Sequence, residues 1–177
     1  MNTEKLLFSG FGGQGILFAG KFIAYHGLLS GKNVSWLPSY GPEMRGGTAS
    51  CGIIISDSDI GSPIVSEPDI LVAMNLPSLD RYEGSVKKGG IIIADSTLIE
   101  RKIVRDDVEA IYITATALAE ENGITPLANM IIAGRLLSIL GKYNKTEIDE
   151  ALSHVISAKH ADMIESNRLA LKIGAEK

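Results

Sequence analysis

The first half of the chain alternates short apolar runs with turns that contain glycine or proline, a pattern typical of buried strands joined by helices. Residues 5–9 form one such run, which ends at Gly10 and predicts a first buried strand. Residues 13–31 are apolar over a length that favours a helix, and residues 33–38 predict a second strand. For this order of elements, parallel pairing with a right-handed crossover is the default.

The pattern changes at residues 48–56, where apolar side chains alternate with other residues as in a strand with one buried face. A turn signal follows at residues 57–59. A hairpin-like excursion is expected here. The predicted sheet is therefore mainly parallel, with room for an antiparallel pair.

The second half first continues the strand pattern and then becomes helical. A helix is expected from Pro77 to about residue 87, and further buried strands are expected at residues 70–74, 91–95 and 108–114. Four helical segments follow, at residues 114–122, 125–141, 145–157 and 161–173. Thr125 and Pro126 fit an N-cap followed by proline at the first helical position. The fold class is thus α/β, a Rossmann-like three-layer domain with a helical C-terminal part.

Composition limits the size and the partners of this domain. The chain has 177 residues, of which 45% are hydrophobic and 21% charged, so residues 1–177 are expected to form one domain with one sizeable core. A net charge of −4 gives no basic surface for nucleic acid. No apolar run reaches the roughly 20 residues of a membrane span, and the N-terminus lacks the basic start of a secretory signal. A cytoplasmic protein without membrane contact is expected.

The residues that usually carry catalysis or bind metals are few. Cys51 is the one cysteine, which excludes an internal disulfide and falls short of the four thiolates of an iron–sulfur cluster. It lies on the apolar face of its strand and is predicted to be a small buried residue. The three histidines have no metal-ligand spacing with it. We therefore expect no metal site, and no catalytic residues on this chain.

A glycine-rich turn, Gly10-Phe11-Gly12-Gly13-Gln14-Gly15, lies between the first predicted strand and the first predicted helix. Backbone N–H groups at such a helix N-terminus can bind phosphate or another anion. The turn predicts a ligand site made by Gly10, Gly12, Gly13, Gln14 and Gly15. The alternative is that these glycines only allow a tight turn and close packing.

Two familiar nucleotide sites are excluded by neighbouring residues. A dinucleotide site needs an acidic residue at the end of the second strand, and residues 36–39 contain none. The sequence Gly15-x-x-x-x-Gly20-Lys21 matches most of a P-loop, but Phe22 stands where Ser or Thr is required. Neither a hydride-transferring dehydrogenase nor nucleotide triphosphate hydrolysis is supported.

The connection from Ser39 to Thr48 combines one proline, three glycines and one pair of opposite charges. If the sheet is doubly wound, this connection lies at the same edge as the glycine-rich turn, where α/β folds place their ligands. Arg45 can pair with a phosphate, a carboxylate or an acidic partner subunit, or can simply hold the loop through Glu43. The candidate ligand-binding residues here are Tyr40, Gly41, Glu43, Arg45, Gly46 and Gly47.

These two segments, taken with three others, resemble the gamma subunit of the 2-oxoacid:ferredoxin oxidoreductases. The other segments that carry the resemblance are Gly61-Ser62-Pro63-Ile64-Val65, Asn75-Leu76-Pro77-Ser78-Leu79 and Gly89-Gly90. The stretch from Tyr40 to Cys51 is similar to the 2-oxoglutarate and branched-chain enzymes in particular. The resemblance implies that the chain is a non-autonomous gamma subunit, inactive alone, in a complex that oxidises a 2-oxoacid, with 2-oxoglutarate preferred, to an acyl-CoA.

The resemblance also implies which parts lie on other chains. Alpha and beta subunits would bind thiamine diphosphate and magnesium, and iron–sulfur clusters on the beta subunit and a ferredoxin-like delta subunit would pass electrons to ferredoxin. The gamma subunit would help to assemble the complex and to seat coenzyme A, binding no other cofactor alone. Two alternatives remain: a purely structural interface subunit, and the equivalent subunit of indolepyruvate:ferredoxin oxidoreductase.

Overall fold

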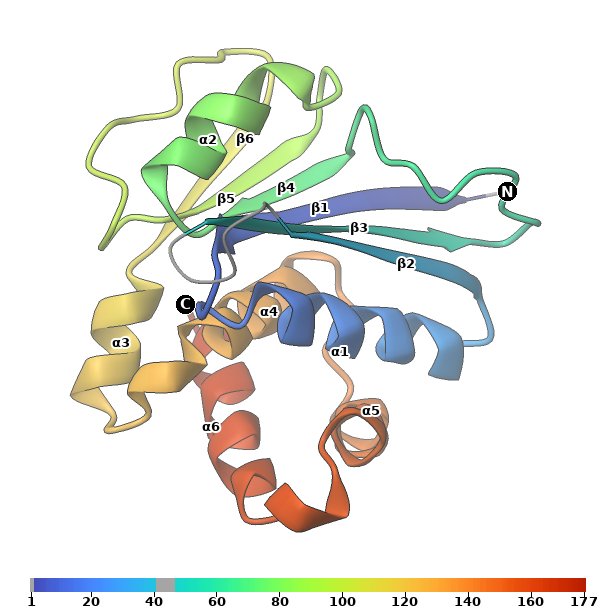
Figure 1. Cartoon of the computed structure of the whole chain (residues 1–177), viewed down its shortest axis with the longest axis vertical. Coiled ribbons are helices and arrows are strands. Elements are labelled where there is room, and N and C mark those ends of the chain that lie inside the picture. Colours follow the sequence, from blue (N-terminus) through green and yellow to red (C-terminus); the bar gives the residue numbers. More distant parts are fainter. Residues whose placement is uncertain (1, 41–46) are drawn as a thin grey trace.

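A computed structural model describes residues 2–40 and 47–177 (Figure 1). Within these residues one sheet is formed by β1 (Thr3–Phe11), β2 (Asn33–Tyr40), β3 (Thr48–Ser56), β4 (Ile70–Ala73), β5 (Ile91–Asp95) and β6 (Glu109–Ile113). The helices are α1 (Ile16–Leu29), α2 (Leu76–Tyr82), α3 (Ala115–Glu121), α4 (Ala128–Ile139), α5 (Lys145–Val155) and α6 (Met163–Ala175). Short 3-10 helices occur at η1 (Glu83–Ser85), η2 (Thr125–Leu127) and η3 (Ala158–His160).

The strands lie in the order β2-β3-β1-β4-β5-β6. The pairs β1/β4, β4/β5 and β5/β6 are parallel, whereas β3 is antiparallel to both β1 and β2. The predicted hairpin is therefore confirmed, but the expected direct parallel pairing of the first two strands is wrong, because β3 lies between them. Since every residue of β3 is buried or partly buried, this strand is suited to an inner position, while β2 is largely exposed.

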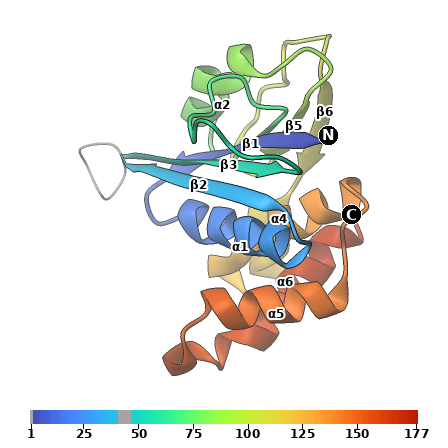
Figure 2. The same ribbon diagram turned by 90° about the vertical axis from the view of Figure 1, so that its right-hand side faces the viewer.

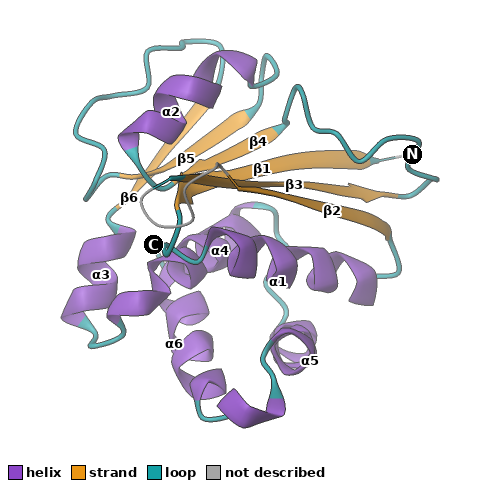
Figure 3. Cartoon of the chain, viewed as in Figure 1, coloured by secondary structure: helices purple, strands orange, loops and turns teal. Residues whose placement is uncertain are grey.

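The sheet has helices on both faces, which confirms the expected α/β architecture (Figures 2 and 3). Helices α1 and α4 cover one face, and α5 and α6 pack behind them. Helix α2 covers the other face, over a smaller core. This smaller core consists of Leu7, Leu71, Ala73, Leu79, Val86, Ile92, Ala94 and Ile99. Within the described ranges, no helix is long and apolar enough to cross a membrane.

Two predicted helix starts lie a few residues from the observed ones. Helix α1 begins at Ile16, because Gly13 and Gly15 adopt positive φ angles of 100° and 72° that end regular helix there. The sequence predicted Thr125 as the N-cap of α4, and this prediction is wrong. Thr125 opens the 3-10 helix η2 instead, and α4 follows from Ala128 without a side-chain cap.

Helices α4 and α6 pack through two glycines. A Cβ atom at Gly134 would lie 2.7 Å from the carbonyl carbon of Leu171, and one at Gly174 would lie 2.7 Å from that of Ile131. Both obstacles are backbone atoms of the opposite helix. The two helices therefore touch through their main chains, and each crossing point needs a residue without a side chain.

Residues 15–21 lie at the start of α1 and inside it, which agrees with the rejection of a P-loop. Gly20 faces the side chain of Cys51 on β3, where a Cβ atom would collide with the sulfur. Cys51 is 1% exposed, and burial raises the pKa of its thiol to about 12. The prediction of a small, buried and unreactive cysteine is confirmed.

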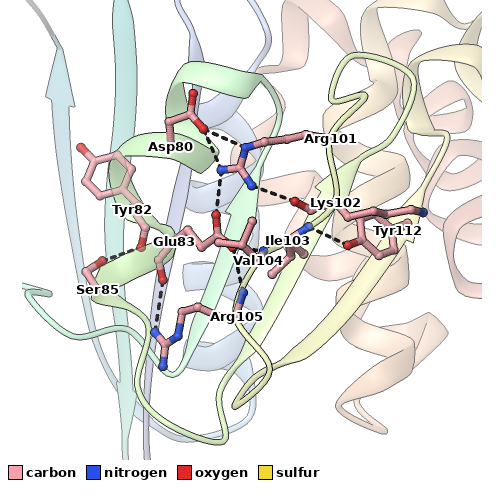
Figure 4. A network of polar contacts seen from close by, with 10 residues as sticks. All are labelled: Asp80, Tyr82, Glu83, Ser85, Arg101, Lys102, Ile103, Val104, Arg105 and Tyr112. Atoms are coloured by element: carbon pink, nitrogen blue, oxygen red, sulfur yellow. Dashed lines mark hydrogen bonds and ion pairs between the residues drawn. The ribbon is translucent and has the colours of Figure 1, made fainter.

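Glu83, which is 5% exposed, accepts hydrogen bonds from the connection between β5 and β6 (Figure 4). One carboxylate oxygen accepts hydrogen bonds from the backbone N–H groups of Val104 at 2.6 Å and Arg105 at 3.4 Å. The other oxygen accepts from the Arg101 guanidinium at 2.7 Å. Arg105 in turn donates to the backbone carbonyls of Glu83 and Val86. One buried carboxylate thus fixes residues 101–105 of this connection against η1.

His26 on α1 is 3% exposed and packs against the start of α5. Its Nε2 atom lies 3.3 Å from Oε2 of Glu147, without the alignment of a hydrogen bond. Burial lowers the pKa of His26 below its ordinary value of 6.5; Glu147 opposes this shift and the charge of Lys142 adds to it. The folded chain therefore resists protonation of this ring.

We expect the free energy of unfolding to depend on pH through His26. A lowered pKa in the folded state means that the unfolded chain binds the proton more readily. The stability due to the neutral ring is full above pH 6.5 and is lost as the pH falls below that value towards the lower pKa of the folded state. Urea unfolding of the parent and His26→Gln between about pH 5 and about pH 8 measures this. An equal pH dependence in both proteins contradicts the expectation, and the exposed His160→Gln serves as the control.

Candidate functional site

The candidate site lies at the edge of the sheet where the parallel strands β1, β4 and β5 end. The glycine-rich turn follows β1 there and leads into α1. Because β3 runs antiparallel to β1, it begins at this same edge, with Phe11 opposite Thr48 and Tyr40 opposite Ala49. The structure thus brings the turn together with both ends of the 40–47 connection, as the sequence predicted from the edge rule.

A direct contact joins the two segments. The N–H of Gly12 donates to the carbonyl of Gly47 at 2.9 Å. Tyr40 is 53% exposed at the end of β2. The other predicted ligand residues of this connection, Gly41, Glu43, Arg45 and Gly46, lie outside the described residues, so their roles stay predictions.

The glycines of the turn are there for different reasons. A Cβ atom on Gly10 would lie 2.6 Å from Oε1 of Gln14, and one on Gly15 would lie 2.8 Å from Cγ of Asn129. Gly13, with φ of 100°, has nothing within 4 Å of its Cβ position among the described residues. Gly10 and Gly15 therefore make room for protein side chains, whereas a Cβ atom on Gly13 would meet no atom of the described residues.

The N–H groups of the turn are not all free for a ligand. Gly12 donates to Gly47, and Gln14 donates to the carbonyl of Phe11 at 3.1 Å. Helix α1, which starts at Ile16, has no side-chain cap and no acidic residue in its first turn. Its first N–H groups and the positive end of its dipole are therefore directed at this edge. An anion at this place would be held by Gly13 and by the first turn of α1.

Gln14 uses both ends of its amide within the protein. Its Oε1 accepts from the N–H of Phe11 at 2.6 Å and from Nδ2 of Asn75 at 3.4 Å. Its Nε2 donates to the carbonyl of Met74, just after β4, at 3.1 Å. The prediction that Gln14 is a ligand residue stays a prediction, while these hydrogen bonds show that its side chain anchors the turn.

Two asparagines at this edge were missed by sequence reasoning. Asn75 caps α2 by accepting from the N–H of Ser78 at 2.8 Å, a role that its place before Pro77 could have indicated. Asn129 on α4 is 3% exposed and donates from Nδ2 to the carbonyl of Gly15 at 2.9 Å. No sequence signal links Asn129 to a turn 114 residues away.

Asp95 at the end of β5 is also buried at this edge. It accepts from Oγ1 of Thr116 at 2.5 Å, from the N–H of Thr97 at 3.1 Å and from the N–H of Thr116 at 3.2 Å. Because these hydrogen bonds engage both of its oxygens, Asp95 serves to fix the start of α3. Within residues 2–40 and 47–177, no group of three or more His, Cys, Asp or Glu side chains is placed to hold a metal ion.

The mixed sheet with helices on both faces, and the glycine turn that opens an uncapped helix beside a hairpin end, define the chain as an α/β domain of the doubly wound class. The family model for pyruvate ferredoxin/flavodoxin oxidoreductase matches residues 5–177. The chain belongs to this family, and within it to the type of the 2-oxoacid:ferredoxin oxidoreductase gamma subunit.

Curated relatives differ in length. The chain is 35% identical over 180 residues to the 2-oxoglutarate synthase subunit KorC of Methanothermobacter marburgensis, covering 98% of this chain and 95% of KorC. It is 36% identical over 173 residues to the ketoisovalerate oxidoreductase subunit VorA of the same organism, covering 97% of this chain but 36% of VorA. The chain therefore spans about a third of the length of VorA and nearly all of KorC.

Solved structures share the fold. The gamma subunit of a keto/oxoacid ferredoxin oxidoreductase from Geobacter sulfurreducens is 27% identical, with a TM-score of 0.86 and coverage of 100% of this chain and 97% of that one. The 2-oxoglutarate:ferredoxin oxidoreductase from Magnetococcus marinus, solved with 2-oxoglutarate, coenzyme A and succinyl-CoA bound, has a TM-score of 0.87 at 22% identity. There the match covers 99% of this chain and 31% of that chain.

Proposed function

We propose that this chain is the gamma subunit of a multi-subunit 2-oxoacid:ferredoxin oxidoreductase and that its glycine turn helps to seat coenzyme A. The observation that carries the proposal is the open Gly13 at the uncapped N-terminus of α1, beside the hairpin end. Coenzyme A is an anionic ligand with several phosphates, which suits a helix N-terminus. Coenzyme A bound in the Magnetococcus marinus enzyme, a relative in fold, supports the choice of ligand.

The substrate that we propose is 2-oxoglutarate. The 2-oxoglutarate synthase subunits KorC match this chain over nearly its whole length and nearly all of theirs, at 33% and 35% identity, which supports this choice. The ketoisovalerate relatives VorA match with similar identity but over a third of their length, so a branched-chain 2-oxoacid is the second candidate. Turnover of 2-oxoglutarate, 2-ketoisovalerate and indolepyruvate by the assembled enzyme decides between them.

The remaining chemistry we assign to partner chains. The chain has one cysteine, and a cluster takes four thiolates, so iron–sulfur clusters must be held elsewhere. In the proposed complex, alpha and beta subunits bind thiamine diphosphate and magnesium, and a ferredoxin-like delta subunit passes electrons to ferredoxin. This chain then contributes to assembly and to the binding of coenzyme A, and it is inactive alone.

The experiment compares two glycines that both adopt a positive φ angle. Gly13 and Gly31 have φ angles of 100° and 73°, and neither has a described atom within 4 Å of its Cβ position. They lie at opposite ends of α1, so Gly31→Val reproduces the strain of Gly13→Val away from the site. In the enzyme assembled with alpha and beta chains, Gly13→Val should raise the KM for coenzyme A at least about tenfold, and Gly31→Val should not.

The outcome also separates the proposal from its structural alternative. Thermal unfolding of both variants shows whether they fold equally well. If Gly13→Val assembles fully and its KM for coenzyme A matches that of the parent, the turn binds no ligand. The chain is then an interface subunit only.

A further inference from the structure

We propose that Gln14 is a positioning residue, which fixes the glycine turn against the end of β4 and thereby sets the place of Gly13 for the ligand. This inference rests on the proposed seating of coenzyme A. It gives Gln14 a role through the turn and not through contact with the ligand. The observations that carry it are the hydrogen bonds of one side chain to Phe11 within the turn and to the consecutive residues Met74 and Asn75 after β4.

The first of these bonds closes the turn on itself. Phe11 and Gln14 exchange two hydrogen bonds, one from the N–H of Gln14 to the carbonyl of Phe11 and one from the N–H of Phe11 to Oε1 of Gln14. The lengths are 3.1 Å and 2.6 Å. Gly12 and Gly13 are therefore the residues enclosed by a small ring of hydrogen bonds, which restricts the directions of their N–H groups.

The second bond joins this ring to the sheet. Nε2 of Gln14 donates to the carbonyl of Met74 at 3.1 Å, and the N–H of Met74 donates to the carbonyl of Ser9 on β1 at 2.9 Å. Met74 is thus bound both to the strand that enters the turn and to the turn itself. The turn cannot tilt away from β4 without breaking the bond from Gln14.

The third contact links the turn to α2. Nδ2 of Asn75 lies 3.4 Å from Oε1 of Gln14, while Oδ1 of Asn75 caps α2. At this length the contact is weak, so it adds alignment and little energy. The turn, the end of β4 and the start of α2 are therefore arranged as one unit around Gln14.

Gly10 shows that the chain makes room for this side chain. A Cβ atom on Gly10 would lie 2.6 Å from Oε1 of Gln14 and 2.6 Å from Cδ1 of Ile16. Gly10 has no positive φ, so its backbone does not require glycine. The space above Gly10 is occupied by Gln14, and this accounts for the first glycine of the motif without a ligand.

The test uses two substitutions of similar length. Gln14→Met removes all hydrogen bonds of the side chain, whereas Gln14→Glu keeps the acceptor for Phe11 and loses the donor to Met74 when it is ionised. In the assembled enzyme, Gln14→Met should raise the KM for coenzyme A about tenfold and leave kcat within about twofold, because the turn is displaced but the chemistry lies elsewhere.

A pH profile separates positioning from general damage. Once protonated, the carboxyl group that Gln14→Glu introduces can donate to the carbonyl of Met74 as the amide does, so the KM of this variant should fall towards that of the parent as the pH is lowered. The KM of Gln14→Met should show no such recovery. Equal pH profiles for the two variants would overturn the role of the Met74 bond.

A second readout needs no coenzyme A. In the full chain, amide hydrogen exchange at Phe11 should be slow in the parent and in Gln14→Glu and at least about tenfold faster in Gln14→Met. Unchanged exchange in Gln14→Met overturns the inference. The inference is also overturned if Gln14→Met shows faster exchange at Phe11 but an unchanged KM for coenzyme A. If Gly13→Val raises the KM in the same experiment, the proposed function stays intact. If Gly13→Val leaves the KM for coenzyme A unchanged, the proposed function is overturned. Faster exchange at Phe11 in Gln14→Met then still supports the anchoring of the turn by Gln14.

Discussion

Gly174→Ala is expected to destabilise the folded chain by about 3 kcal/mol or more, although it adds only one methyl group. The added Cβ would lie 2.7 Å from the carbonyl carbon of Ile131 and 2.9 Å from the backbone nitrogen of Arg135, both on α4. Backbone atoms of a packed helix cannot turn aside as a side chain can. Alanine stabilises a free helix by about 1 kcal/mol relative to glycine. The collision must cost more than this for the substitution to destabilise the folded chain.

The measurement is the urea midpoint of Gly174→Ala beside that of the parent. Gly84→Ala is the matched control, because nothing described lies within 4 Å of a Cβ atom there. The control should change stability by no more than about 0.5 kcal/mol. A Gly174→Ala midpoint equal to that of the parent would show that α4 and α6 can move apart at little cost.

Glu83→Ala should lower the free energy of unfolding by about 3 kcal/mol, the lower end of the loss expected when one partner of a buried ion pair is removed. The side chain of Glu83 is 7% exposed, and its removal leaves Arg101 and the N–H groups of Val104 and Arg105 without this acceptor. The lower end applies because Arg101 is 31% exposed and can be solvated in part. Unfolding in urea gives the loss directly.

Asp80→Ala provides the control, since Asp80 pairs with the same Arg101 but is 56% exposed. A surface pair of this kind contributes at most about 1 kcal/mol. Glu83→Gln keeps an acceptor oxygen and should fall between the two. If Asp80→Ala and Glu83→Ala cost the same, the buried carboxylate does not hold the connection between β5 and β6 as described.

The strands and helices could be predicted because their signals are local. The β-branched run within Ile91–Asp95 forms a buried inner strand, and the periodic segments after residue 114 form helices, within a few residues of the expected bounds. The place of β3 was not predictable in the same way. Pairing with β1 depends on which strand gains most from burial on both sides, and that is decided by the whole sheet and not by the strand itself.

The site was predictable as far as the edge rule reaches. The turn and the 40–47 connection meet because strand ends meet, which the order of elements indicates. The anchoring contacts of Gln14 with Met74 and of Asn129 with Gly15 join residues 60 and 114 positions apart. Such contacts depend on how the helices pack on the sheet, so no local sequence pattern predicts them.

The hairpin of β2 and β3 has a consequence for how this edge can vary. Its register fixes Tyr40 and Gly47 beside the turn through eight consecutive residue pairs, from Asn33 with Ser56 to Tyr40 with Ala49. Residues inserted or removed between these two anchors change no strand pairing and no core contact of the described residues. The length of this connection can therefore differ between related chains while the paired strands on either side of it keep their register.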